Sequence, residues 1–477
     1  MIFFSMRLAI TVIMVLLAAT IFSCAEPLPA TTPTPDAKPT LASSRTQSLA
    51  PISAPESTPI PTQSLALNST TESAPIPTQS LALNSAPESA LILTPTQDQG
   101  LTTIPALTGT KSTVKDLSNI YIGCLHSAHT KYSDGRLLYP GEFYSLFRQI
   151  WDWVATTDHD IYLDTLKWQD MVKNSNDYNR KDFVSFFGYE WTSSIWGHLS
   201  VVFKGDPPSK TSVQGKSSDP DYDNPQKLSA FLDTADGLAV FAHPTLSGLS
   251  IDFNRESDYK NDAVACLVGI FGINNTIHWN ATWDYADGRT IPVPGAESAY
   301  DGGWIKKALN RGYRLGFVGA LDLHKKEINP MSYRYTGVVA DSLTREGIFK
   351  ALKERHTYAV MSPSGLGKRI LLRADAGNYL MGDIFASEST MINVTLQGKT
   401  DLAQFTLINL FVNGKIVQSR VVSGRDLVED FSFTLVEGDN YTFFEVRALS
   451  VDGQVSQAFT SPMYVTVSQA RDQNGEY

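Results

Sequence analysis

The sequence predicts an α/β domain followed by a small all-β sandwich. Up to about Ser364, short apolar runs alternate with segments whose apolar residues recur every three or four positions, a pattern typical of buried parallel strands and their covering helices. After Arg369 the chain shows short strand-like runs separated by turn signals such as Asn413-Gly414. Together these regions exceed the usual size of one domain, so we expect two, at 111–365 and 366–477.

Each expected element has a local signal. Buried strands are expected at 121–123, 153–156, 184–187, 238–241 and 315–319. Helices are expected at 141–150, 162–173, 225–234, 303–311 and 344–354. The β region should contain strands at 370–372, 391–396, 406–412, 431–435, 441–449 and 463–467.

Metal-ligand side chains follow or end the five buried runs. They are His126, His129 and Asp134, then His159, Glu190, His243, and finally Asp322 and His324. Because catalytic side chains collect at the carboxyl ends of strands in βα folds, these residues predict one polynuclear metal centre. Imidazole and carboxylate ligands suit Zn, Mn or Fe, and the lack of thiolates among them favours a catalytic site over a structural one.

A known family has similar motifs in the same order. The chain resembles the polymerase and histidinol phosphatase (PHP) superfamily of metallophosphoesterases in the segments 125–135, Thr157-Asp158-His159-Asp160, Glu190, Gly197-His198, Ala242-His243-Pro244 and Asp322-Leu323-His324. The resemblance spans roughly Ile120 to His324, and 345–361 resembles the segment that closes such domains. It implies a distorted (β/α)7 barrel that holds two or three divalent metal ions.

The resemblance also implies ligand sets and a reaction. A first metal would be bound by His126, His129 and Asp322, a second by His198 and His243 with Glu190 as the bridge, and a third by Asp134, His159 and His324. Glu190, Asp322 and His243 are the expected catalytic residues. Neighbouring metals about 3.5–4 Å apart can generate hydroxide near neutral pH and bind both oxygens of a displacement at phosphorus. We therefore expect a phosphoesterase acting on a small phosphorylated substrate.

The spacing of the first two histidines departs from the family. The family leaves one residue between them, whereas Ser127 and Ala128 separate His126 from His129. On a regular strand the two side chains would face opposite ways. A bulge at Ser127-Ala128 would restore a common direction.

Two other functions remain open from the sequence. One is hydrolysis of a carboxylic or carbamic ester by the same centre, and the other is a non-catalytic surface protein whose β region binds glycan or protein. A net charge of −10 argues against stable binding of duplex nucleic acid. The β region carries no catalytic cluster, so support or ligand contact is its expected role.

The N-terminus predicts export. Residues 1–23 have a basic start and a short apolar run, as a signal peptide does, and Ile21-Phe22-Ser23-Cys24 resembles a bacterial lipobox that would place lipid on Cys24. Residues 24–110 are rich in Pro, Thr and Ser, partly repeated, and expected to be a disordered tether. We expect a membrane-anchored lipoprotein at the cell surface or in the periplasm, with secretion or an uncleaved anchor as the alternatives.

Several residues near the motifs have less specific signals. Asp158 and Asp160 would orient ligand imidazoles, and His278 and His356 would serve packing or the surface. Trp191 and Trp196 are expected in the core. The loop cations are expected to be mostly solvated charges, with phosphate binding as the alternative; they are Lys131, Arg136, Lys325 and Lys326.

Overall fold

The structure is a computed structural model of the whole chain. It describes residues 115–468 except 136–137, 206, 208, 210–211, 247, 256–266, 272–276, 294–295, 297–298, 325–332, 363–368 and 402. The chain divides into the units Met1–Leu101 and Thr102–Tyr477, and every described residue belongs to the second. The expected signal peptide, Cys24 and the tether lie outside the described residues, as do Arg136, Lys325 and Lys326.

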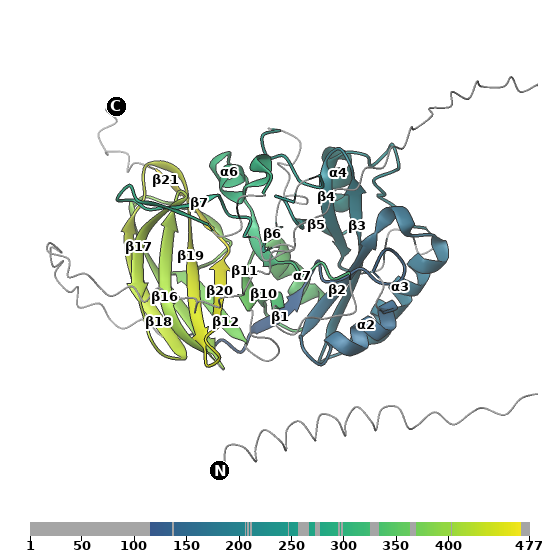
Figure 1. Cartoon of the computed structure of the whole chain (residues 1–477), viewed down its shortest axis with the longest axis horizontal. Helices are drawn as coiled ribbons and strands as arrows, with labels where there is room; N and C mark the ends of the chain where they lie inside the picture. The colour runs from purple at the N-terminus through teal and green to yellow at the C-terminus, as the bar shows by residue number, and fades with distance from the viewer. Residues whose placement is uncertain are drawn as a thin grey trace, which may run out of the picture. The chain divides into compact units, whose positions relative to one another are not determined.

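A mixed sheet organises the first half of the described region (Figure 1). Its strands are β1 (Ile120–Cys124), β2 (Trp153–His159), β3 (Val184–Ser193), β4 (Gly197–Phe203), β5 (Gly237–Phe241), β6 (Leu267–Phe271) and β9 (Gly316–Gly319), paired in this order. All pairs are parallel except those of β4, which runs antiparallel to both β3 and β5. The five strands expected from the sequence therefore all run in one direction.

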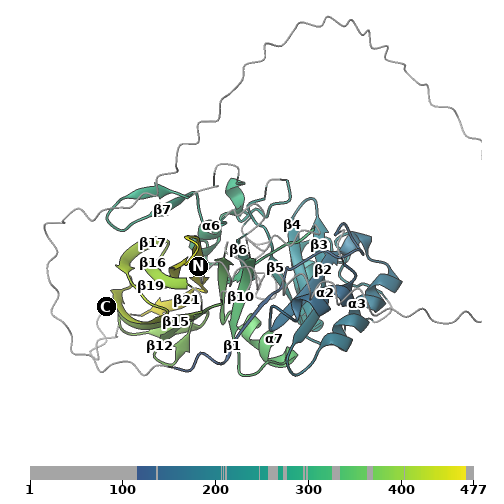
Figure 2. The ribbon, with the colours of Figure 1, turned by 60° about the horizontal axis from the view of Figure 1, so that its bottom comes forward.

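Helices cover this sheet where the sequence has the expected periodicity. They are α2 (Pro140–Phe147), α3 (Thr165–Tyr178), α4 (Pro225–Thr234), α6 (Ile305–Asn310) and α7 (Arg345–Lys353), with short 3-10 turns η1 (Asp160–Tyr162) and η4 (Asp301–Gly303). α2 and α3 lie side by side over the β2 and β3 side of the sheet (Figures 1 and 2). Two helices begin at side-chain caps, since Asp164 accepts from the backbone N–H of Lys167 and Asn224 from that of Lys227.

The described residues do not form a regular (β/α)7 barrel. A hairpin joins β3 directly to β4, where a helix would be expected in a strict alternation. Gly197 permits the turn because it has φ +83°, a conformation that other L-residues rarely adopt. The result is a sheet-dominated α/β region with few helices.

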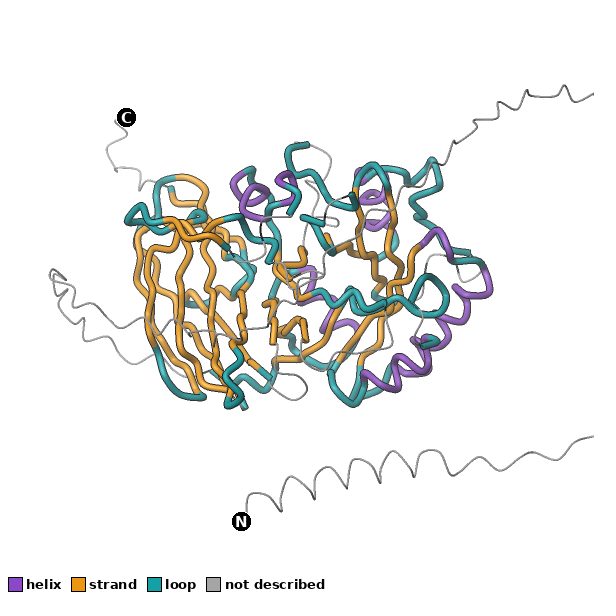
Figure 3. The backbone as a smooth tube through the Cα atoms, viewed as in Figure 1, coloured by secondary structure: helices purple, strands orange, loops and turns teal. Residues whose placement is uncertain are grey.

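Two facing sheets build the second half. One has the order β13 (Tyr379–Leu380), β12 (Ile370–Ala376), β15 (Met391–Thr400), β18 (Asp426–Thr434). The other contains β14 (Ile384–Ser387), β16 (Ala403–Val412), β17 (Lys415–Val421), β19 (Gly438–Ser450), β20 (Val455–Thr460) and β21 (Met463–Val467). Buried and exposed residues alternate along β18, and its buried Phe431 packs on Phe444 of β19 with ring centroids 4.9 Å apart. Figure 3 shows this half as almost entirely strands.

The two halves share a sheet and a core. β10 (Tyr333–Val339) pairs with β1 and β11 (Thr357–Ser362), and β11 pairs with β20, so hydrogen bonding continues across the expected boundary at 365/366. Trp279 contacts Phe443, with centroids 4.9 Å apart. A small hairpin of β7 (Thr282–Asp284) and β8 (Thr290–Pro292) places Trp283 against Phe459.

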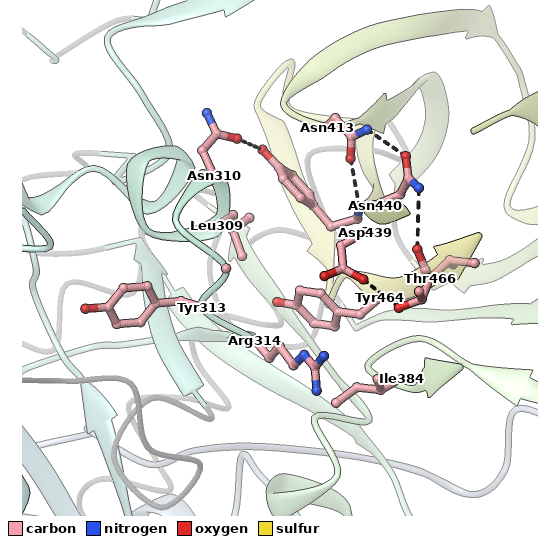
Figure 4. Close-up of a pocket in the computed structure, with 13 residues that line it drawn as sticks. Leu309, Asn310, Tyr313, Arg314, Ile384, Asn413, Asp439, Asn440, Tyr464 and Thr466 are labelled. Atoms are coloured by element: carbon pink, nitrogen blue, oxygen red, sulfur yellow. Dashed lines mark hydrogen bonds between the residues drawn. The ribbon is translucent and has the colours of Figure 1, made fainter. Parts of the chain in front are cut away.

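A cavity of about 430 Å³ lies where α6 meets the β region (Figure 4). Its polar side chains bond across the junction and to each other. The Tyr441 hydroxyl donates to the Asn310 amide oxygen at 2.6 Å, and the Asn413 amide donates to Asn440 at 2.8 Å. The Tyr441–Asn310 bond joins the β region to α6, and the Asn413–Asn440 bond lies within the β region. Within the described residues, no helix is both long and apolar enough to cross a membrane.

Candidate metal centre

The strand ends bring all nine expected ligands together. His159 is the last residue of β2, Glu190 lies near the end of β3, and His198 is the second residue of the antiparallel β4. His126, His129, His243, Asp322 and His324 follow β1, β5 or β9 within a few residues, and Asp134 lies on the loop after His129. Four groups have ligand atoms within 4.8 Å of one another: His126, His129 and Asp322; His126, Glu190 and His243; His159, Glu190 and His198; and His129, Asp134, His159 and His324.

Two histidines and one aspartate converge most closely. Asp322 Oδ1 lies 3.1 Å from His126 Nε2 and 2.9 Å from His129 Nε2. All three atoms are buried, and none makes a hydrogen bond. Buried polar atoms without hydrogen bonds are rare in native proteins and indicate an ion or water that satisfies them. Ligand atoms each about 2.0–2.2 Å from one ion would be separated by about 3–4 Å, which these distances fit.

The two histidines share a direction because strand β1 has already ended. β1 stops at Cys124, so the alternation of side chains along a strand does not apply at His126 and His129. This segment pairs instead with the ligand loop after β9, since the backbone N–H of Asp322 donates to His126 O and that of His129 to Leu323 O. Asp322 itself has φ +48°. This uncommon conformation for a non-glycine residue occurs where surrounding contacts enforce it.

Glu190 lies at the middle of the cluster. Its Oε1 is 3.1 Å from both His198 Nδ1 and His243 Nε2, and its Oε2 is 2.9 Å from His159 Nδ1 and 3.3 Å from His129 Nε2. Burial disfavours the ionised carboxylate, but the surrounding histidines outweigh burial and hold the pKa of Glu190 well below its usual range. The carboxylate is therefore negatively charged and reaches several histidines at once.

The remaining ligands form a more exposed part of the cluster. Asp134 Oδ2 lies 3.6 Å from His159 Nε2 and 3.4 Å from His324 Nε2, and its Oδ1 lies 3.6 Å from His129 Nδ1. His129 and His159 each belong to two of the groups. The groups defined by distance therefore share residues, whereas the three ligand sets that the resemblance implies are separate.

In the group of His126, His129 and Asp322, the two histidines differ in protonation. Burial lowers the pKa of His126, which favours the neutral imidazole that metals require. Burial also opposes the charge on His129, but the nearby carboxylates of Asp322 and Glu190 outweigh burial and raise the pKa of His129 to about 9. A metal ion would therefore displace a proton from His129 on binding.

Neutral hydroxyl groups orient the ligand imidazoles, and the sequence did not reveal them. Thr157 Oγ1 and Ser200 Oγ lie 3.0 and 2.5 Å from His126 Nδ1, which directs Nε2 toward Asp322. Thr192 Oγ1 lies 2.7 Å from His159 Nδ1. Thr157, Thr192 and Ser200 sit on strands beside the ligands, but serine and threonine are too common for this proximity to stand out in a sequence.

The two aspartates next to His159 have a different role from the expected one. Asp158 accepts from Thr130 N at 2.7 Å and from Ser133 Oγ at 2.7 Å, so it holds the loop that carries His129 and Asp134. Asp160 accepts from the backbone N–H of Thr192 at 3.2 Å. Neither hydrogen-bonds a ligand imidazole in the described part of the chain, because both carboxylates turn toward backbone and hydroxyl donors.

The other sequence candidates lie outside the cluster. His278 is buried and hydrogen-bonds Thr245, and His356 pairs with Asp383 at 2.8 Å. Trp191 is fully buried, as expected for a core residue. Lys131 places its ammonium 4.5 Å from the Tyr139 ring centroid. Burial raises the pKa of the Cys124 thiol to about 12, which favours its protonated form, and Cys124 belongs to none of the four ligand groups.

A cavity of about 380 Å³ opens onto the cluster. Its walls include Glu190, His243 and Asp322 from the buried part of the cluster and Asp134 and His324 from the more exposed part. The fold and the cluster thus define a sheet-dominated α/β protein with a buried His/Asp/Glu centre suited to divalent metals.

Comparisons with known proteins give distant similarities. No protein-family model matches the chain. An uncharacterized protein of Chlamydia pneumoniae is 24% identical over 200 residues, which cover 37% of this chain and 31% of that protein, so the chain spans about a third of its length. A solved structure of a two-domain Bacteroides vulgatus protein is described as containing a predicted PHP-like metal-dependent phosphoesterase. It is 14% identical to this chain with a TM-score of 0.38, and the match covers 71% of this chain and 94% of that protein. Fibronectin(III)-like modules of Clostridium thermocellum CbhA are 16% identical with a TM-score of 0.15, over 20% of this chain and 99% of theirs.

Proposed function

We propose that this protein is a metal-dependent phosphoesterase of the PHP type. The observation that carries the proposal is the convergence of His126 Nε2, His129 Nε2 and Asp322 Oδ1, three buried atoms without hydrogen bonds. Asp322 also lines the open cavity. A purely structural cluster would satisfy these atoms internally. The order of the sequence motifs, which resembles that of the PHP superfamily, supports phosphorus as the reacting centre.

The ligand chemistry supports two or three divalent ions of Zn, Mn or Fe. Nine of the thirteen ligand positions across the four groups are imidazole nitrogens and the other four are carboxylate oxygens, the donors that these metals accept. When bound, the ions would lower the pKa of a coordinated water and offset the charge on phosphoryl oxygens. In the net reaction water adds to phosphorus, the P–O bond to the alcohol breaks, and the alcohol leaves with a proton derived from water.

The chain's own residues would prepare the centre for this reaction. Glu190 supplies a buried negative charge within reach of His129, His159, His198 and His243, which allows it to bridge neighbouring cations. Thr157 and Ser200 fix the orientation of the His126 ring, and Asp158 fixes the loop of His129. The site therefore needs no covalent nucleophile.

Metal analysis combined with an ester assay tests the proposal. Protein covering residues 111–477 should bind at least two equivalents of Zn or Mn and hydrolyse p-nitrophenyl phosphate in a chelator-sensitive way. Preference for p-nitrophenyl acetate would instead favour the carboxylic ester alternative. Folded protein that binds no metal, or activity indifferent to chelation, would contradict the proposal.

We also propose that the protein is an extracytoplasmic lipoprotein. The support is the N-terminal sequence, with its signal-like apolar run, Cys24 and a Pro-rich tether. Cys24→Ser should move the full-length protein from the membrane to the soluble fraction without changing its ester hydrolysis, because lipid on Cys24 would be its anchor. Equal partitioning of mutant and wild type into membranes would remove this assignment.

A further inference from the structure

The cavity above the metal centre has a polar floor and an apolar rim. Four rim side chains are apolar: Ile161, Tyr162, Leu246 and Leu249. Three of them are strongly exposed, with 46% of Ile161, 51% of Tyr162 and 40% of Leu249 accessible to solvent. Single exposed apolar residues are ordinary, but several around one cavity mark a surface that a ligand covers.

Local bonds hold one side of the rim in place. Ile161 and Tyr162 belong to η1, whose first residue, Asp160, is buried and accepts a backbone hydrogen bond from Thr192 at 3.2 Å. The Tyr162 carbonyl accepts from the Lys167 ammonium at 2.8 Å. Because the backbone is anchored at both ends of this turn, the two apolar side chains stay at the cavity mouth.

Leu246 and Leu249, on the other side of the rim, follow a different metal-ligand residue, His243. The backbone N–H of Leu246 donates to His243 O at 3.0 Å, and that of Leu249 donates to Leu246 O at 3.2 Å. Ile161 and Tyr162 likewise come two and three residues after His159, and the Tyr162 ring centroid lies 6.1 Å from that of His159. Both apolar pairs are thus tied through short turns to ligands of the metal centre. A group in contact with them would be joined to an ester at the centre by only a few bonds.

We propose that the substrates are esters with an apolar alcohol portion, which binds against Ile161, Tyr162 and Leu249. This inference rests on the proposed phosphoesterase function. An alkyl or aryl group would remove its own apolar surface and that of the rim from water, whereas the hydroxyls of a glycerol or sugar would lose hydration there without gaining partners from these side chains. The metal centre would take the phosphoryl group of the same molecule.

Two alkyl phosphates of similar intrinsic reactivity test the inference. The metal-loaded protein should hydrolyse n-hexyl phosphate with a kcat/KM at least about tenfold above that for glycerol 3-phosphate, measured as released inorganic phosphate. In the double variant Ile161→Ser/Tyr162→Ser this ratio should fall about tenfold, mainly through KM. Leu166→Ser is the matched control, because Leu166 is 76% exposed on nearby α3 but does not line the cavity. The control should keep the wild-type ratio.

A binding measurement separates this inference from the proposed function. Calorimetry with hexylphosphonate and methylphosphonate needs no turnover, and tighter binding of the hexyl compound that depends on Ile161 and Tyr162 would support the inference even without hydrolysis. Equal affinities for the two phosphonates, or a kinetic ratio that the double variant leaves unchanged, would overturn it. Loss of hydrolysis of both phosphates with this binding preference intact would count against the phosphoesterase proposal alone.

Discussion

At the scale of single residues, a substitution at the buried Glu190 carboxylate can distinguish an effect on catalysis from an effect on folding. Glu190→Gln keeps the shape of the side chain but removes the negative charge that faces four histidines. We expect metal content to fall and kcat to drop by at least about a hundredfold, since the charge that offsets the bound cations is lost. Metal stoichiometry and steady-state kinetics measure both effects.

Glu445 provides a matched control for this variant. It is equally buried, and its carboxylate accepts hydrogen bonds from Asn409 at 2.7 Å and Arg447 at 2.6 Å in the β region. Glu445→Gln should lower the free energy of unfolding by about 1–3 kcal/mol and leave kcat unchanged. A Glu190→Gln protein with full metal and near-wild-type kcat would show that Glu190 is not a bridge.

Another buried residue, His278, should make the protein sensitive to acid. Burial lowers the pKa of His278 to about 3, whereas in the unfolded chain it is near its usual 6.5. The unfolded state therefore binds more protons between these values, and the free energy of unfolding falls as the pH is lowered from 6.5 toward 3. In His278→Gln that fall should be smaller by more than about 1 kcal/mol at pH 4.5.

Denaturant unfolding of wild type and His278→Gln at pH 7 and pH 4.5 checks this expectation. The partly buried pair of His356 with Asp383 gives a control, and His356→Gln should not reduce the acid sensitivity in the same way. Parallel pH profiles for wild type and His278→Gln would refute the assignment of acid sensitivity to this histidine.

At the scale of elements, the β3–β4 hairpin depends on one glycine. A Cβ at Gly197, which has φ +83°, would lie 2.8 Å from both Ser250 O and Ile251 Cγ1. Gly197→Ala should therefore lower the free energy of unfolding by about 2–4 kcal/mol and reduce activity, because the adjacent His198 would shift. Thermal denaturation and kinetics test both effects.

Gly288 separates backbone strain from steric overlap. It has φ +88°, but nothing lies within 4 Å of an added Cβ. Gly288→Ala should cost only about 1 kcal/mol and leave activity intact. Equal losses in the two variants would mean that the close approach at Gly197 does not matter.

The positions of elements were more predictable than their pairing. The apolar run before each ligand marked a strand, and α4 has the expected bounds, because a Pro after the capping Asn224 signals its start. The antiparallel placement of β4 and the β11–β20 pairing were not predictable, since backbone pairing between distant segments leaves no local pattern. The ligand residues were recognisable in the sequence because they follow the apolar runs. The hydroxyls of Thr157 and Ser200 were not recognisable, because their contacts with His126 leave no local pattern.

At the scale of the whole molecule, the β region should be required for folding of the metal-binding region. β11 pairs with β20 across the expected domain boundary, and Phe317 of β9 packs on Phe443 with centroids 5.3 Å apart. A protein ending at residue 365 would expose this apolar surface and an unpaired strand edge. We expect it to aggregate or to give no cooperative unfolding transition, while residues 111–477 unfold cooperatively.

Circular dichroism melting and size-exclusion chromatography of the two proteins make this comparison. A protein with Phe443→Leu is the milder test, since it keeps both regions but weakens their contact, and it should lower the melting temperature without preventing folding. A soluble, cooperatively folded and metal-binding 111–365 fragment would show that the β region is dispensable.

The backbone pairing of His126 and His129 with the loop around Asp322 sets when the metal site can arise. These segments are about 200 residues apart in the chain, so closing that loop costs chain entropy that only later contacts offset. During synthesis, both histidines leave the ribosome long before Asp322 does. The complete trio exists only once most of the first region is assembled, and tight metal uptake would therefore report the end of its folding.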